Sequence, residues 1–116
     1  MSKKALILTW EKYQDHEVIY PYYRVQGEGF ECDIMTNIIG RVHGYLGTYN
    51  ESTQSVFDLD DPKKYEKHMA DYDLLIIPGG VKALEYLRQQ TNALKFINEW
   101  DSKGKVIACI CHGAQL

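Results

Sequence analysis

Short apolar runs recur along the chain and predict the buried strands of one sheet. Each is bounded by glycine, proline or a cluster of polar residues, and most are almost continuously apolar. Continuous rather than alternating apolar character is typical of parallel strands that are covered on both faces. Strands are therefore expected over residues 5–9, 30–36, 72–77 and 106–110.

Segments with apolar residues at helical spacing separate these runs. In the first segment Val18, Tyr22 and Val25 share one face, Asp15 is the expected N-cap, and Gly27 is expected to end the helix. Strand–helix–strand units of this length normally give parallel strands joined by a right-handed crossover. The pattern predicts the α/β class, a flavodoxin-like doubly wound sheet with mainly parallel strands and helices on both faces. Further helices are expected over residues 63–70, 81–90 and 92–102.

Two stretches leave alternatives open. Pro21 falls inside the first helical segment and marks either a kink or a later helix start, because proline removes a backbone donor. Residues 38–53 carry glycines and aromatic residues and suit either a short strand pair or an extended loop.

Composition limits the classes of function. The 116 residues carry 13 Lys and Arg against 16 Asp and Glu, a net charge of −3, without a basic stripe, so no nucleic-acid partner is expected. Apolar runs stay below membrane-spanning length and the N-terminus does not resemble a signal peptide, so we expect a cytoplasmic protein that binds no membrane. Three cysteines, an odd number, favour free thiols. The length suits a single domain over residues 1–116.

Candidate chemistry lies where the last apolar run ends. The run stops at Cys111, Gly113 permits a sharp turn, and residues 114–116 are good helix formers. Strand, turn and helix start together make a nucleophile elbow with sulfur in place of a serine hydroxyl. A thiolate is stabilised at a helix N-terminus, and His112 is a candidate proton partner.

Two other interpretations of these cysteines are open. Cys111 can be an ordinary cysteine of an apolar strand, and Cys109 fits that description more fully because it lies inside the run. Cys109, Cys111 and His112 can together bind a metal, but the CxxC spacing of structural zinc sites is absent and no second ligand pair follows. No metal and no cofactor are therefore expected.

A second candidate element is Pro78-Gly79-Gly80, directly after the strand over residues 72–77. Two adjacent glycines present bare backbone N–H groups at the carboxyl end of a parallel strand. This is the end at which α/β folds bind their ligands.

Four stretches of the chain form an ordered set of motifs: 17–22 (Glu-Val-Ile-Tyr-Pro-Tyr), 43–45 (His-Gly-Tyr), 73–80 (Asp-Leu-Leu-Ile-Ile-Pro-Gly-Gly) and 108–113 (Ala-Cys-Ile-Cys-His-Gly). In content and order these motifs resemble the PfpI/ThiJ superfamily of the class I glutamine amidotransferase-like fold, in its PfpI-like branch. The resemblance implies that Cys111 is the reactive nucleophile. It also implies that Glu17 lies beside the sulfur, commonly protonated, and donates a hydrogen bond to the thiolate.

The resemblance implies further site residues. Backbone N–H groups of Gly79, Gly80 and His112 are expected to form an oxyanion hole for a carbonyl substrate. Glu85 is the candidate for the acid that a neighbouring subunit contributes to a Cys-His-acid set, which implies a homo-oligomer. Its spacing from the glycine pair is about one residue longer than the family's pattern. Gln14 departs from that pattern, because some members carry an acidic residue there.

The resemblance also bears on extent and function. The family's domain continues past the elbow, so residues 1–116 are expected to be the amino-terminal portion of a longer domain, truncated just after it. The leading hypothesis is an enzyme whose Cys111 thiolate attacks a small electrophilic carbonyl or amide, as a hydrolase, a peptidase or a glyoxalase- or deglycase-like lyase. The alternatives are a redox-sensing or stress-protection module that uses oxidation of Cys111, and a glutamine amidotransferase-like domain.

Overall fold

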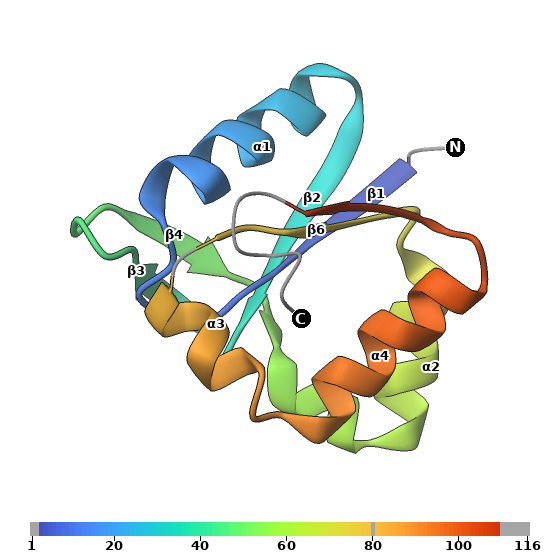
Figure 1. The fold of residues 1–116 in the computed structure, drawn as a ribbon. Coiled ribbons are helices and arrows are strands. Elements are labelled where there is room, and N and C mark those ends of the chain that lie inside the picture. The colour runs from blue at the N-terminus through green and yellow to red at the C-terminus, as the bar shows by residue number, and fades with distance from the viewer. Residues whose placement is uncertain (1–2, 80, 110–116) are drawn as a thin grey trace.

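The computed structural model, which describes residues 3–79 and 81–109, is built around a five-stranded sheet in the order β5-β2-β1-β6-β7 (Figure 1). Every neighbouring pair is parallel. From β1 at the centre the chain builds outward to β2 and β5, then crosses to the other side for β6 and β7. This is a doubly wound sheet, so the predicted fold class is confirmed. The strands are β1 (Lys3–Leu8), β2 (Phe30–Thr36), β5 (Gln54–Ser55), β6 (Leu74–Ile77) and β7 (Val106–Cys109).

Helices cover both faces of this sheet because its strands are apolar on both. Leu6 and Leu8 pack into a core with Phe96 and Trp100 of α4, whereas Ile7 points to the opposite face and packs with Val18 of α1. Figure 1 shows α2 and α4 next to each other, apart from α1. The helical elements are α1 (Asp15–Gly27), the 3₁₀ helix η1 (Val56–Asp60), α2 (Pro62–Asp71), α3 (Val81–Leu87) and α4 (Thr91–Ser102).

Residues 38–53 form the strand pair that was one of the two sequence alternatives. Strands β3 (Gly40–His43) and β4 (Tyr49–Ser52) pair in antiparallel fashion as a separate two-stranded sheet. Val42 of β3 is fully buried in the same core as Val18. The hairpin therefore packs on the α1 side of the main sheet.

The first helix differs from the sequence prediction at its start. Gln14, not Asp15, occupies the N-cap position, and Asp15 is the first helical residue. The Asp15 side chain makes tertiary hydrogen bonds in place of a local cap. Pro21 lies buried inside one continuous helix, where it leaves the Glu17 carbonyl without its usual i+4 amide donor.

The second helix begins as the sequence indicates. Asp61 caps α2 by accepting a hydrogen bond from the Lys63 amide at 3.0 Å, and Pro62 occupies the first turn. Proline is favoured there because its missing N–H would have no intrahelical partner.

Two side chains fix β7 against the helical layer. The Trp100 indole Nε1 donates to the Val106 carbonyl at 2.9 Å. Lys105 Nζ lies 4.0 Å from the centroid of the Trp100 ring and donates to the Met69 carbonyl of α2 at 2.5 Å. These contacts hold the strand that leads toward residue 111.

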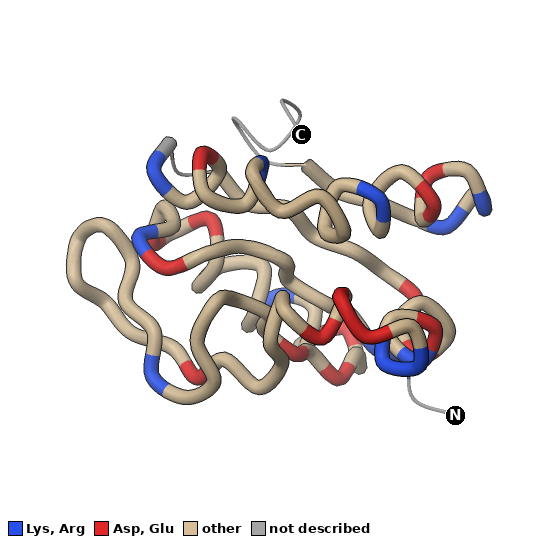
Figure 2. Tube along the Cα trace, turned by 90° about the horizontal axis from the view of Figure 1, so that it is seen from below, with Lys and Arg blue, Asp and Glu red and all other residues tan. Residues whose placement is uncertain are grey.

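Charged residues of both signs are interspersed along the chain (Figure 2). Over the described ranges no helix is long and apolar enough to cross a membrane.

Candidate active site

The candidate site lies at the carboxyl edge of the parallel sheet. Strands β1, β6 and β7 are adjacent, and Ile77 at the end of β6 pairs with Cys109 at the end of β7. Parallel strands end at the same edge, so the last residues of β1, β6 and β7, which are Leu8, Ile77 and Cys109, lie along one edge of the sheet. Gly79 lies two residues beyond β6 at this edge.

Glu17 is brought to this edge by the first turn of α1. Its Oε1 accepts a hydrogen bond from the Gly79 amide at 3.1 Å, and the side chain is half-buried. The Gly79 carbonyl in turn accepts from the Gln14 amide at 3.2 Å. The start of α1 thus binds both polar backbone atoms of Gly79. The structure joins two residues that the sequence analysis had singled out separately, 62 positions apart.

Glu85 lies on α3, which begins just after the glycine pair. Ala83, Leu84 and Leu87 of this helix are buried, whereas Glu85 is exposed on its outer side. The exposed position leaves Glu85 accessible from outside this chain.

The rest of the predicted catalytic set lies outside the described residues. This applies to the nucleophile and its neighbour, Cys111 and His112, and to Gly80 of the expected oxyanion hole. The elbow turn and the helix start that follows it fall there as well.

The two described cysteines have the character of unactivated thiols. Burial, followed by the nearby Asp33 charge, raises the pKa of Cys32 to about 12. Partial desolvation of the thiol and then the Asp101 charge raise the pKa of Cys109. Cys109 lies in β7, as expected for a strand cysteine, but its side chain is exposed and not buried as is usual for such a residue.

Aromatic residues gather at the same edge. Trp10, two residues past β1, packs against the cores of both sheet faces. Its ring stacks on Tyr86 of α3 with centroids 5.8 Å apart, and Phe57 of η1 meets it edge-on at 5.9 Å. This contact fastens α3 and η1 to the end of β1. The periodicity of the sequence gave no sign of the cluster, because Trp10 lies in a loop.

Thr9 lies between this cluster and the end of β1. Its hydroxyl is fully buried and, among the described residues, has no hydrogen-bond partner.

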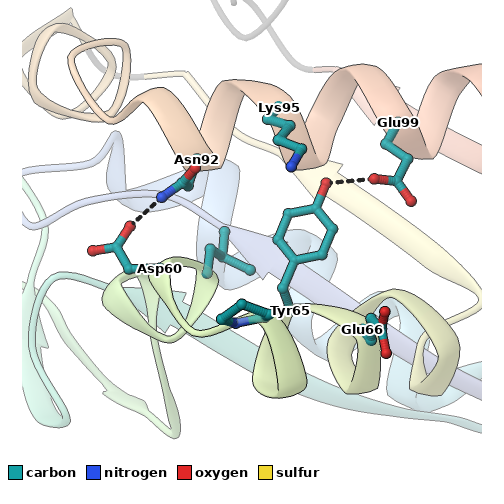
Figure 3. Close-up of a pocket in the computed structure, with 8 residues that line it drawn as sticks. Asp60, Tyr65, Glu66, Asn92, Lys95 and Glu99 are labelled. Carbon is teal, nitrogen blue, oxygen red and sulfur yellow. Dashed lines mark hydrogen bonds between the residues drawn. The ribbon is translucent and has the colours of Figure 1, made fainter.

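The structure also contains a groove away from this edge, between η1, α2 and α4 (Figure 3). The polar side chains that line it are largely paired with one another. The Tyr65 hydroxyl donates to Glu99 Oε1 at 2.8 Å, and Asn92 Nδ2 donates to Asp60 Oδ1 at 2.7 Å. The Tyr65 pKa is raised by burial and by Glu99. These contacts have a structural role, joining α4 to α2 and η1.

Metal binding has no support in the described part of the chain. No group of three or more His, Cys, Asp or Glu side chains there is arranged to hold an ion.

Comparison with protein families gives a match over residues 3–116 to the model described as the DJ-1/PfpI family. The chain belongs to the DJ-1/PfpI family. Similar proteins include a deglycase of Pyrococcus horikoshii, 35% identical over 97% of this chain and 63% of the relative, and Deglycase PfpI of Pyrococcus furiosus, 34% identical with the same coverage. Protein/nucleic acid deglycase 2 of Escherichia coli is 29% identical over 100% of this chain and 63% of its own length.

Solved structures agree with the fold. A two-domain protein of Anabaena variabilis with DJ-1/ThiJ/PfpI-like and ferritin-like domains superposes with a TM-score of 0.82 at 26% identity, covering 98% of this chain and 31% of that one. Drosophila melanogaster DJ-1beta gives a TM-score of 0.80 at 19% identity, covering 99% of this chain and 58% of that one. The chain thus spans less than two thirds of the length of these DJ-1/PfpI relatives.

Membership of the DJ-1/PfpI family confirms the resemblance drawn from the sequence. It also gives the Glu17–Gly79 contact a context, because both residues lie in motifs on which that resemblance rests. Asp15, two residues before Glu17, was considered only as a helix cap. In the sequence, the only trace of its tertiary contact is Gly44 of the His-Gly-Tyr motif, where a side chain would collide with the Asp15 carboxyl group.

Proposed function

We propose that this protein is a cysteine-dependent enzyme of the deglycase type, in which the Cys111 thiolate attacks a small electrophilic carbonyl. The observation that carries the proposal is the hydrogen bond between Glu17 and Gly79 at the carboxyl edge of the sheet. An acid side chain and a buried backbone amide thereby meet just past the end of β6. Strand β6 pairs with β7, whose last residue, Cys109, precedes Cys111 by two positions. The names of the related deglycases support the same class.

The proposed chemistry assigns one role to each group. The sulfur electron pair forms a bond to the carbonyl carbon, and the carbonyl π pair moves to the oxygen. Because the Gly79 amide already donates to Glu17, the backbone amides of Gly80 and His112 are assigned to stabilise the developing negative charge, and Glu17 supplies the proton that the oxygen takes up. Glu85 from a neighbouring subunit would complete a Cys-His-acid set in a homo-oligomer.

The decisive experiment compares Cys111→Ser with Cys109→Ser as a matched control. Turnover is measured as methylglyoxal consumption and as release of free amine from a methylglyoxal-treated amino acid. The Cys111 variant is expected to lose more than about 10³-fold in kcat/KM, whereas the control keeps its rate, because only the nucleophile forms the covalent bond. Equal activity of the two variants would refute the proposal.

A redox-sensing role makes a different prediction for the same variants. Peroxide treatment followed by peptide mass analysis would then show selective oxidation of Cys111 in a protein that turns over neither substrate.

A further inference from the structure

Asp15 has more buried contacts than a helix-starting residue requires. Its side chain is 1% exposed. Oδ1 accepts a hydrogen bond from the Leu46 amide at 2.7 Å, and Oδ2 accepts from the Thr48 amide at 3.0 Å and from the Thr48 hydroxyl. Burial alone would raise the pKa of Asp15, but the bonds from Thr48 and Leu46 outweigh it and lower the pKa. Asp15 therefore binds the hairpin turn as an anion.

The hairpin turn is shaped to receive this carboxylate. Gly44 is buried against it, and a Cβ atom at that position would lie 2.5 Å from the Asp15 Cγ. The turn is closed by its own backbone, since the Gly44 amide donates to the Thr48 carbonyl at 2.8 Å. Asp15 thus packs against a preformed loop.

The same turn is bound by the segment between β1 and α1. The Lys12 amide donates to the His43 carbonyl at 2.8 Å, and the Tyr45 amide donates to the Tyr13 carbonyl at 2.8 Å. Lys12 has a φ of +74°, a region that L-residues adopt only when the surroundings require it. Tertiary bonds, and not local preference, therefore set the path into α1.

Helix geometry links Asp15 to the site. Residues two positions apart on an α-helix project about 200° apart, so Asp15 and Glu17 point to opposite sides of the first turn. Asp15 binds the hairpin on one side and Glu17 binds the Gly79 amide on the other. Pro21 removes the amide that would otherwise pair with the Glu17 carbonyl, so the first turn depends more on these side-chain bonds.

We propose that Asp15 is a positioning residue, which fixes the rotation of the first turn of α1 against the hairpin and so holds the Glu17 carboxyl in place at Gly79. This inference rests on the proposed role of Glu17 beside the thiolate. Asp15 itself touches no reacting atom. Its effect on chemistry passes through Glu17 alone.

The test is a double-mutant cycle on the intact protein. The rate of Cys111 alkylation by iodoacetamide is measured from pH 5 to 9 in the wild type, Asp15→Asn, Glu17→Ala and the double variant. Asparagine at position 15 has one acceptor oxygen where aspartate has two. Its NH2 group would face the N–H or O–H donors of Leu46 or Thr48, so the hydrogen bonds to one of these residues are lost. Asp15→Asn is expected to slow the alkylation of Cys111 about tenfold when Glu17 is present, because Glu17 then no longer holds the thiolate in place. The same substitution is expected to have no effect on the rate once Glu17 is absent.

Asp33→Asn is the matched control. Asp33 accepts hydrogen bonds from the Tyr72 hydroxyl at 2.6 Å and the Thr53 hydroxyl at 3.1 Å. Tyr72 lies just before β6 and Gly79 lies just after β6, so the contact between Asp33 and Tyr72 is at the opposite end of this strand from the site. The control is expected to reduce stability without changing the alkylation profile. If Asp15→Asn does not fold, Thr48→Val removes one donor only and should give a smaller change with the same dependence on Glu17.

Two results would overturn the inference. If Asp15→Asn changes alkylation equally with and without Glu17, Asp15 does not act through Glu17, and the role of Glu17 still stands. If Glu17→Ala by itself leaves alkylation and turnover unchanged, the proposed role of Glu17 fails and the positioning role fails with it.

Discussion

Replacing Gly44 with alanine tests the contact between the hairpin and the start of α1 in the most direct way. The added Cβ would lie 2.5 to 2.6 Å from three atoms of the Asp15 carboxyl group, so either the carboxylate or the turn must move. Gly44 does not have a positive φ, so the cost comes from this collision and not from backbone strain. Gly47 and Gly27 provide controls, because a Cβ at either position meets nothing within 4 Å.

The magnitude follows from the hydrogen bonds at risk. A hydrogen bond to a charged group contributes about 1.5–3 kcal/mol, so loss of one or two of the Asp15 bonds lowers the free energy of unfolding by about 1.5–6 kcal/mol. Gly47→Ala places a side chain at a φ of +95° and should cost about 1–2 kcal/mol through strain alone. Gly27→Ala, at the end of α1, should be neutral or stabilising by up to about 1 kcal/mol.

Urea unfolding of the three variants measures these differences, and a cycle with Asp15→Ala assigns their cause. With the carboxyl group removed, Gly44→Ala should cost less than about 1 kcal/mol, whereas the cost of Gly47→Ala should stay the same. Additive effects of Gly44→Ala and Asp15→Ala would show that the carboxylate is not the obstacle and would refute the reasoning.

Two further predictions concern titration and thiol reactivity. Because the folded-state pKa of Asp15 lies below its ordinary value of 3.8, its contribution to stability is present above about pH 4 and is lost as the pH falls through the folded pKa. Asp15→Asn should therefore flatten the acid limb of the stability curve between pH 5 and 2, measured by thermal unfolding, and an unchanged slope would contradict the assignment. With a pKa of about 12, Cys32 should remain unmodified by iodoacetamide at pH 8 in the folded protein and react only after denaturation, as peptide mass analysis would show.

The sheet could be predicted because its strands are covered on both faces. Residues 5–8 are all fully buried, and a run without polar positions is the direct signature of that environment. β5 has two residues, Gln54 and Ser55, and no apolar run, so periodicity had nothing to detect. Its place beside β2 is set by tertiary pairing.

The sequence could single out Glu17 and Gly79, but not the contact between them. Glu17 and Gly79 were chosen from separate motifs, and only the fold brings them within hydrogen-bonding distance. Asp15 was predicted to cap the start of its own helix, because sequence spacing indicates only contacts with neighbouring residues. Its actual partners, Leu46 and Thr48, are more than 30 residues away.

The hydrogen bond between Glu17 and Gly79 makes it possible to test two roles of an acid beside a thiolate. One role is to donate a hydrogen bond to the sulfur, and the other is to transfer a proton to the substrate oxygen. Oε1 accepts from the Gly79 amide, so in the proposed mechanism Oε2 carries the proton and faces the sulfur. Glutamine at this position keeps an oxygen for Gly79 and an N–H for the thiolate but has no proton to transfer, whereas alanine loses both hydrogen bonds.

Glu17→Gln should therefore keep the alkylation rate of Cys111 within about threefold of the wild type and lose about 10²–10⁴-fold in kcat, whereas Glu17→Ala should lose both properties. Iodoacetamide needs no proton from the enzyme, so alkylation reports on the thiolate alone. If the glutamine variant turned over substrate at the wild-type rate, the acid would serve only to hold the thiolate, and the proton for the oxyanion would have to come from another group. If it lost alkylation as completely as the alanine variant, the sulfur would depend on the carboxyl group in a way that an amide of the same shape does not reproduce.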